Sequence, residues 1–137
     1  MQVPESSTKV AFKNILFLTD FTEASQPAMQ YAIELAQRHG AKFYAGHVRT
    51  PETPQFLEGP ALTTYFNEVR EQKRAELSKL IKPYILDAEV LLAEGFIEYA
   101  IQRWTISHGI DLIVLGTHGR QGLQRMLLAT RPRQASS

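Results

Sequence analysis

A glycine-rich segment, residues 116–122 with the sequence GTHGRQG, has the residue types and spacing best suited to chemistry in this chain. It follows an apolar run directly, and we expect it to open a helix. Glycine lets backbone N–H groups approach an anion closely, and a helix N-terminus adds a favourable dipole. The hydroxyls of Thr117 and Thr130 and the guanidinium of Arg120 would complete a phosphate cradle. The imidazole of His118 would also contact the phosphate. The same glycines fit a strand-to-helix turn that binds no ligand.

A carboxylate, Asp20, ends the first apolar run and begins the turn into the first helix. In dinucleotide-binding folds such a carboxylate binds ribose hydroxyls, whereas Asp at this place also caps helices, and both interpretations stand. Two better-known phosphate motifs are excluded. The turn at residues 19–23 reads TDFTE rather than the dinucleotide pattern G-x-G-x-x-G, and the Gly-Lys-Ser/Thr of a Walker A loop occurs nowhere.

Catalytic machinery is not visible in the sequence. The chain contains no cysteine, no nucleophile paired with a base and no two carboxylates at useful spacing. The four histidines lack metal-ligand spacing with carboxylates, so we expect structural or surface roles for them, with His118 as the exception. We therefore predict a binding protein with neither a catalytic nor a metal site.

Four short apolar runs alternate with longer amphipathic stretches, which predicts strands separated by helices. We expect strands at residues 15–18, 42–48, 88–93 and 112–115, a loop at 49–60, and helices from Thr22 or Ser25 to Gly40, over 62–82 and over 97–108. The fold class is therefore α/β, with an open, mostly parallel, twisted sheet and helices on both faces, as in a Rossmann-like domain. If the fourth strand returns beside the first, the order is 3-2-1-4. The carboxyl ends of strands one and four, with Asp20 and Gly116, then face each other across one crevice.

The C-terminal part of this pattern stops early. A short helix is expected at residues 123–128, and no fifth apolar run follows it. We interpret residues 1–137 as a single domain with an N-terminal extension at 1–12 and a tail at 131–137. Without a fifth strand, the edge of strand four would be free to pair with another chain. A truncated chain is the alternative explanation.

Composition and charge narrow the class of protein. With 137 residues, 44% hydrophobic and 21% charged, the chain can bury one core and is not of disordered composition. It has no cysteine, no signal-peptide pattern and no apolar run near the roughly 20 residues that span a bilayer, which predicts a cytoplasmic protein without a membrane partner. Residues 112–137 carry four arginines and no acid. This favours a phosphate-bearing partner over a specific nucleic acid, with a solvated basic tail at Arg131 and Arg133 as the alternative.

At this point the chain resembles the universal stress protein family. The resemblance is carried by Asp20-Phe21-Thr22 after strand one, His47-Val48 at the end of strand two, Glu94-Gly95, and the run DLIVLGTHGR at residues 111–120. Nucleotide-binding members of the family carry the pattern Gly-x2-Gly-x9-Gly-[Ser/Thr]. Here that pattern falls on Gly116, Gly119, Ala129 and Thr130.

The resemblance implies a stress-response regulatory protein that binds ATP or AMP, with or without Mg²⁺, at the switch point between strands one and four. It also implies a homodimer and a strand order of 3-2-1-4-5, and it leaves slow ATP hydrolysis open. Asp20 would lie by the ribose, the backbone of Val48 by adenine, and the glycine loop with Thr130 by the phosphates. The expected nucleotide site comprises Thr19, Asp20, Thr22, Val48, Gly116, Thr117, His118, Gly119, Arg120, Gly122, Ala129 and Thr130.

Two departures from the family pattern define the alternative. Ala129 stands where the third glycine is expected, so an Ala129→Gly substitution should strengthen nucleotide binding. The expected loss of the fifth strand leaves an edge open for a strand-exchanging oligomer. The alternative function is therefore a dimeric interaction module of the same family that binds no nucleotide.

Overall fold

The alternation of apolar strands and amphipathic helices builds one five-stranded sheet in the computed structural model of the chain, which describes residues 11–50, 54–118 and 124–130. The elements are, in chain order, β1 (Asn14–Leu18), α2 (Ser25–His39), β2 (Lys42–Arg49), α3 (Pro60–Ile81), β3 (Glu89–Glu94), α4 (Ile97–His108), β4 (Leu112–His118) and β5 (Gln124–Thr130). The fold is therefore α/β, as predicted from the sequence.

The strand order is β3-β2-β1-β4-β5, and the first four strands are parallel. The predicted order 3-2-1-4 is therefore confirmed. The central strand β1 lies between β2 and β4 and is buried on both faces, with Ile15 and Phe17 on one face and Leu16 and Leu18 on the other. Burial on both faces explains why its sequence is a continuous apolar run rather than an alternating one.

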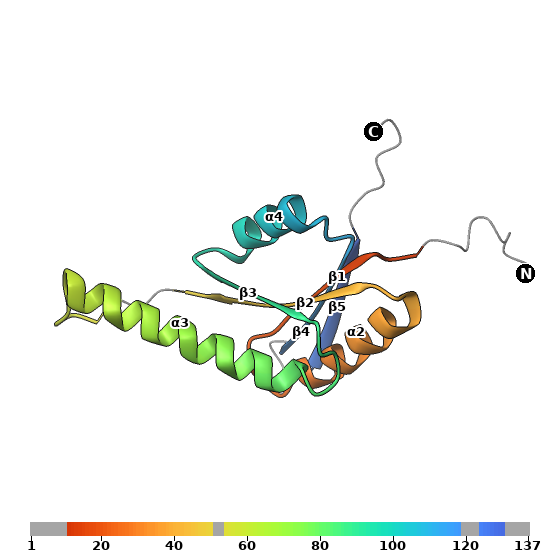
Figure 1. Cartoon of the computed structure of the whole chain (residues 1–137), viewed down its shortest axis with the longest axis horizontal. Helices are drawn as coiled ribbons and strands as arrows, with labels where there is room; N and C mark the ends of the chain where they lie inside the picture. The colour runs from red at the N-terminus through yellow and green to blue at the C-terminus, as the bar shows by residue number, and fades with distance from the viewer. Residues whose placement is uncertain (1–10, 51–53, 119–123, 131–137) are drawn as a thin grey trace, which may run out of the picture.

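Helices cover both faces of the sheet, as Figure 1 shows, with α2 and α3 on one side and α4 on the other. The larger core lies under α2 and α3 and includes Phe17, Phe43 and Leu77. The smaller core lies under α4 and joins Leu16 to Trp104. This arrangement follows from right-handed crossovers, because the chain moves outward from β1 to β3 and then returns past β1 to β4.

The helix ends agree with the sequence in part. Gly40 and Gly109 end α2 and α4 in the left-handed region, with φ of 62° and 65°, as predicted. The expectation that Thr22 or Ser25 is the N-cap of α2 is wrong, because the cap position is Ala24 and no side chain caps it. The hydroxyls of both residues bond to Asp20 instead.

The long helix α3 begins at Pro60, which is tolerated at the first helical position, rather than at Leu62. Of its residues, only Leu77 and Ile81 are fully buried. Figure 1 shows the reason, since the N-terminal end of α3 extends past the ends of the strands.

The absence of a fifth strand and the short helix at residues 123–128 are both wrong. Residues 124–130 form β5, antiparallel to β4, with Leu112 opposite Thr130 and His118 opposite Gln124. A short apolar run such as Met126–Ala129 does not distinguish helix from strand by its period. The unpaired N–H and C=O groups of the β4 edge supply the missing preference, because a strand satisfies them and a helix does not.

Other expected segments lie mostly outside the described residues. These are the extension at 1–12, apart from its last two residues, and the tail at 131–137. Across the part of the chain that the structure describes, no helix is long and apolar enough to cross a membrane.

Candidate functional site

The carboxyl ends of β1, β2 and β4 meet at one edge of the sheet, and Asp20 lies there directly after β1. Its Oδ1 atom accepts three hydrogen bonds: from the backbone N–H of Thr22 at 3.0 Å, from the Thr22 hydroxyl at 2.5 Å and from the Ser25 hydroxyl at 3.0 Å. These bonds hold the turn between β1 and α2. Among the described residues Oδ2 accepts no hydrogen bond, so this oxygen is available to a ligand.

Asp20 is ionised under ordinary conditions. Partial burial would raise its pKa, but the hydrogen bonds from Thr22 and Ser25 outweigh this effect and lower the pKa from its ordinary value of 3.8. Both interpretations of this residue from the sequence therefore have a structural basis. Oδ1 holds the turn before α2, and Oδ2 is free to accept a hydrogen bond from a ligand at the carboxyl ends of the strands.

Gly116 lies on β4 one residue beyond the pair of Leu18 with Leu115, so it comes level with Thr19. A Cβ atom at this position would lie 2.9 Å from the Cα of Ser25 and even closer to the carbonyl oxygen of Ala24. Glycine is therefore required for the first turn of α2 to approach β4. The structure brings Gly116 and Asp20 together through Ser25, which contacts both.

Val48 presents backbone groups at the same edge. Successive residues of a strand bond alternately to its two neighbouring strands. The Gly46 carbonyl accepts from the N–H of Thr19, and the Arg49 carbonyl accepts from the N–H of Gly95 beyond β3. The N–H and C=O of Val48 consequently face β1, whose pairing with β2 ends at Gly46. The Val48 side chain packs against the core under α4.

Thr19 and Phe21 shape the turn beside these groups. The Thr19 hydroxyl oxygen accepts a hydrogen bond from the N–H of Phe21 at 2.9 Å, and Phe21 adopts a left-handed φ of 65°. His47 lies against the Phe21 ring, with 4.7 Å between ring centroids, and its Nδ1 is 2.9 Å from the Thr19 carbonyl oxygen. Because that oxygen only accepts, Nδ1 carries the proton in this contact. The expected structural role of His47 therefore has a defined partner, whereas nothing in the spacing of the sequence predicts the contact.

A cavity of about 160 Å³ opens beside this turn on the face covered by α2 and α3. It is lined by Phe17, Thr19, Phe21, Thr22, Ser25, Gln26, Met29, Glu76 and Leu80. This volume is below the roughly 300–1,000 Å³ of pockets that enclose a whole small ligand. A nucleotide would therefore lie mainly along the sheet edge, with only part of it in the cavity.

The residues expected to hold phosphate are not all brought together. Thr117 and His118 continue β4 at the carboxyl edge, opposite Arg125 and Gln124 of β5. Ala129 and Thr130 pair with Ile113 and Leu112, at the other end of β4 from Asp20. The structure therefore separates Thr130 from the edge where the phosphate cradle was expected.

Three further residues of the expected cradle, Gly119, Arg120 and Gly122, lie outside the described residues. Within the described ranges, no group of three or more His, Cys, Asp or Glu side chains is placed to hold a metal ion.

The fold and this edge define a Rossmann-type α/β domain whose open carboxyl edge lies at the switch point between β1 and β4. Residues 11–130 match the universal stress protein family. The chain belongs to this family.

Individual relatives agree with this assignment. A universal stress protein of Thermus aquaticus is 32% identical over 123 residues, which cover 88% of each chain. A universal stress protein of Methanocaldococcus jannaschii is 26% identical over 125 residues, covering 87% of this chain and 72% of the relative. The solved structure of the universal stress protein UspA from Lactobacillus plantarum is similar, with a TM-score of 0.58 and 25% identity over 83% of this chain and 85% of that one.

Proposed function

We propose that this protein is a cytoplasmic stress-response regulator that binds an adenine nucleotide, ATP or AMP, at the carboxyl edge between β1 and β4. One observation carries the proposal. Asp20, whose Oδ2 is free among the described residues, and Val48, whose backbone groups face β1, each lie two residues beyond Leu18 and Gly46, the last register pair of β1 with β2. Open α/β sheets bind their ligands in the crevice outside the carboxyl ends of the strands, at the switch point of the strand order.

The chemistry of these groups suits a nucleoside. A carboxylate oxygen accepts hydrogen bonds from ribose hydroxyls, and an ionised acceptor makes such bonds stronger. A backbone N–H and C=O pair matches the acceptor and donor on the edge of adenine. The phosphates would then extend toward the end of β4 at Thr117 and His118. Mg²⁺ held by phosphates needs few protein ligands, so a nucleotide could bring its own ion.

We further propose a binding role without dedicated catalysis. Support comes from the two described carboxylates nearest the cavity: Oδ1 of Asp20 is engaged by Thr22 and Ser25, and Glu76, which lines the cavity, pairs with Lys73 at 3.5 Å. General-base catalysis needs a group aimed at the attacking water.

The test is calorimetric titration of the purified protein with ATP and AMP, together with a search for nucleotide released on denaturation. Asp20→Asn keeps an oxygen for Thr22 and Ser25 but replaces an acceptor with an NH₂ donor, so nucleotide affinity should fall about tenfold. Asp87→Asn removes the same charge at an exposed position and should leave affinity unchanged. Absence of released nucleotide and of binding at millimolar ATP would refute the proposal.

A second candidate is the dimeric interaction module that binds no nucleotide, with a second copy of the chain as its partner. Phe96, which caps α4, and Tyr99 and Ile106, which share one face of α4, are 69%, 65% and 73% exposed. An apolar stripe of this kind on a helix is typical of an interaction surface. The expected open edge on β4 no longer supports this candidate, because β5 covers it and is itself the outer strand of the described sheet.

A further inference from the structure

A cluster of cationic side chains lies at the carboxyl ends of β2 and β3, next to the proposed nucleotide edge. Arg49 is the last residue of β2 and pairs in register with Glu94, the last residue of β3. Phe66, Arg70 and Lys73 are spaced along one face of α3, which packs over these strand ends. The guanidinium of Arg49 lies over the ring of Phe66, 5.4 Å from its centroid.

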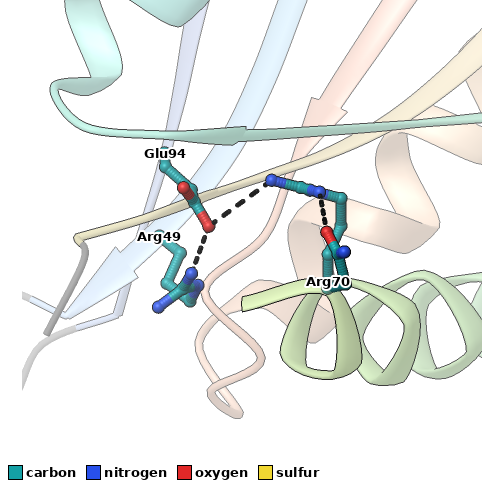
Figure 2. A network of polar contacts seen from close by, with 4 residues as sticks. Arg49, Arg70 and Glu94 are labelled. Carbon is teal, nitrogen blue, oxygen red and sulfur yellow. Dashed lines mark hydrogen bonds and ion pairs between the residues drawn. The ribbon is translucent and has the colours of Figure 1, made fainter. Parts of the chain in front are cut away.

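Glu94 joins the two arginines. Its Oε2 atom accepts a hydrogen bond from Arg49 and lies 3.9 Å from a terminal nitrogen of Arg70, as Figure 2 shows. Arg70 is also oriented by Asn67, whose side-chain oxygen accepts from it at 3.1 Å. The guanidinium groups of Arg49 and Arg70 are therefore both held near the carboxylate of Glu94. These contacts use only a few of the five N–H donors of each guanidinium group.

The carboxylate at this point does not balance the positive charge around it. Arg49, Arg70, Lys73 and Glu94 line one shallow pocket, which His47 also lines. The Nζ atom of Lys73 lies 3.5 Å from Oε1 of Glu76 and 4.9 Å from the centroid of the Phe21 ring. The three cationic side chains and the two acids, Glu94 and Glu76, together leave one net positive charge. The Arg49 side chain is only 17% exposed, and there like charges repel more strongly than in water.

We propose that Arg49, Arg70 and Lys73 bind a phosphoryl group, and that Glu94 is the resident carboxylate that this group displaces from the two guanidinium groups. Planar guanidinium groups bind phosphate in a bidentate manner, and a phosphate presents more acceptor oxygens and more charge than a carboxylate. Glu94 is free to move aside, because its side chain is 30% exposed and lies at the end of a strand, before Gly95.

The position of the cluster allows two sources for the phosphoryl group. The contact of Lys73 with Phe21 connects the cluster to the turn that carries Asp20. The group is therefore either part of a nucleotide that binds at that turn in the reverse orientation, with its phosphates toward the ends of β2 and β3 rather than toward Thr117 and His118, or a separate free phosphate. The proposal for the cluster stands without the nucleotide, since it depends only on the cationic residues and Glu94.

The test is calorimetric titration of the full chain with inorganic phosphate and, separately, with ATP and adenosine, at constant ionic strength in chloride. Arg70→Gln should lower phosphate affinity about tenfold, and Glu94→Gln should raise it several-fold because it removes the competing charge. Arg74→Gln is the matched control, since Arg74 lies on the same helix but pairs with Glu71. This control should leave phosphate affinity unchanged.

The ATP arm separates the two sources. If the group belongs to the nucleotide, Arg70→Gln weakens ATP and leaves adenosine unchanged. If it is a free phosphate, Arg70→Gln weakens phosphate and leaves ATP unchanged. Binding of phosphate by a protein that does not bind ATP would support the cluster while refuting the proposed nucleotide function.

A purely structural role predicts another result. In that case Glu94→Gln would lower the melting temperature, and neither it nor Arg70→Gln would change the affinity for phosphate or ATP. That outcome would overturn the proposal. Arg70→Lys keeps the charge and loses the bidentate geometry, so a folded Arg70→Lys protein should fall between wild type and Arg70→Gln in affinity.

Discussion

At the scale of single residues, Asp20 divides its two oxygens between structure and chemistry. Oδ1 accepts three hydrogen bonds, from the backbone N–H and hydroxyl of Thr22 and from the hydroxyl of Ser25. Oδ2 remains open at the sheet edge. A residue that both organises a helix start and meets a ligand couples ligand binding to the position of that helix.

The lowered pKa of Asp20 predicts a pH dependence of stability. Its pKa is below 3.8 in the folded protein, so its contribution to the free energy of unfolding is present above about pH 4 and is lost as the pH falls through the folded pKa. The stability difference between wild type and Asp20→Asn should therefore be constant near neutral pH and shrink below about pH 4. Urea unfolding of both proteins from pH 7 to pH 2.5 measures this difference. A difference that grows toward acid pH would contradict the assignment.

Gly116 is the residue whose substitution should be costly for steric reasons. Gly116→Ala places a Cβ 2.9 Å from the Cα of Ser25 and against the Ala24 carbonyl, both of which are backbone atoms that cannot move aside cheaply. Because these contacts are so short, we expect a loss in the free energy of unfolding at the upper end of the usual cost of overpacking, which is about 1–3 kcal/mol. Urea unfolding checks it.

Gly40→Ala is a suitable comparison for that measurement. A Cβ at Gly40 meets nothing within 4 Å, but the residue has a φ of 62°. Its substitution should therefore cost only the left-handed backbone penalty of about 1 kcal/mol. Equal losses at the two glycines would show that α2 does not approach β4 as described.

At the scale of elements, β5 changes the meaning of the C-terminal residues. A helix at 123–128 would have left the edge of β4 open and directed Thr130 toward a phosphate. The antiparallel strand instead carries Ala129 and Thr130 to the amino end of β4. The same short apolar run serves either element, and pairing with β4 decides between them.

This pairing reverses the expectation for Ala129→Gly. Glycine within a strand loses more conformational freedom on folding, so the substitution should lower stability by about 0.5–1 kcal/mol. ATP affinity should remain that of wild type, because Ala129 lies opposite Ile113 and away from the carboxyl edge. Thermal unfolding and ATP titration of this variant check both statements. Stronger ATP binding would restore the phosphate role first expected for this position.

At the scale of the whole molecule, one edge of the sheet gathers the polar groups of interest. Glu94 and Arg49 end β3 and β2, Asp20 follows β1, and Gly116 and His118 end β4. The opposite amino edge is instead tied together by Asp111, whose carboxylate accepts from the N–H groups of Lys13 and Asn14. Ligand chemistry and structural anchoring are thus separated between the two ends of the strands.

The outer surface of α4 predicts self-association at this scale. Ile106→Lys places a charge in the exposed stripe formed with Phe96 and Tyr99, and should shift a dimer toward monomer by at least tenfold in dissociation constant. Light scattering across a concentration series measures the shift. Gln30→Lys adds the same charge at an exposed position of α2, on the other side of the sheet from α4, and should leave the dissociation constant unchanged. A wild-type protein that is monomeric at high micromolar concentration would refute the dimeric candidate.

Much of the fold could be predicted from local patterns. The apolar runs are long enough to identify four strands, and their alternation with helices restricts the crossovers to right-handed ones. The order 3-2-1-4 also needs the fourth strand to return beside the first, a supposition that the family resemblance supports. Gly40 and Gly109 ended their helices as expected, because a left-handed cap depends on the residue itself. These features depend on properties that each segment carries within its own sequence.

Other features depend on neighbours that are distant in the sequence, and only the tertiary structure decided them. The identity of β5 depends on the open edge of β4, and the need for glycine at 116 depends on the approach of α2. The cluster of Arg49, Arg70 and Glu94 joins two strand ends and a helix face. The sequence by itself therefore determined the parallel sheet and the candidate edge at Asp20. The tertiary structure decided which residues reach that edge. The hydrophobic periodicity of a single segment does not show which other segments it pairs with or packs against.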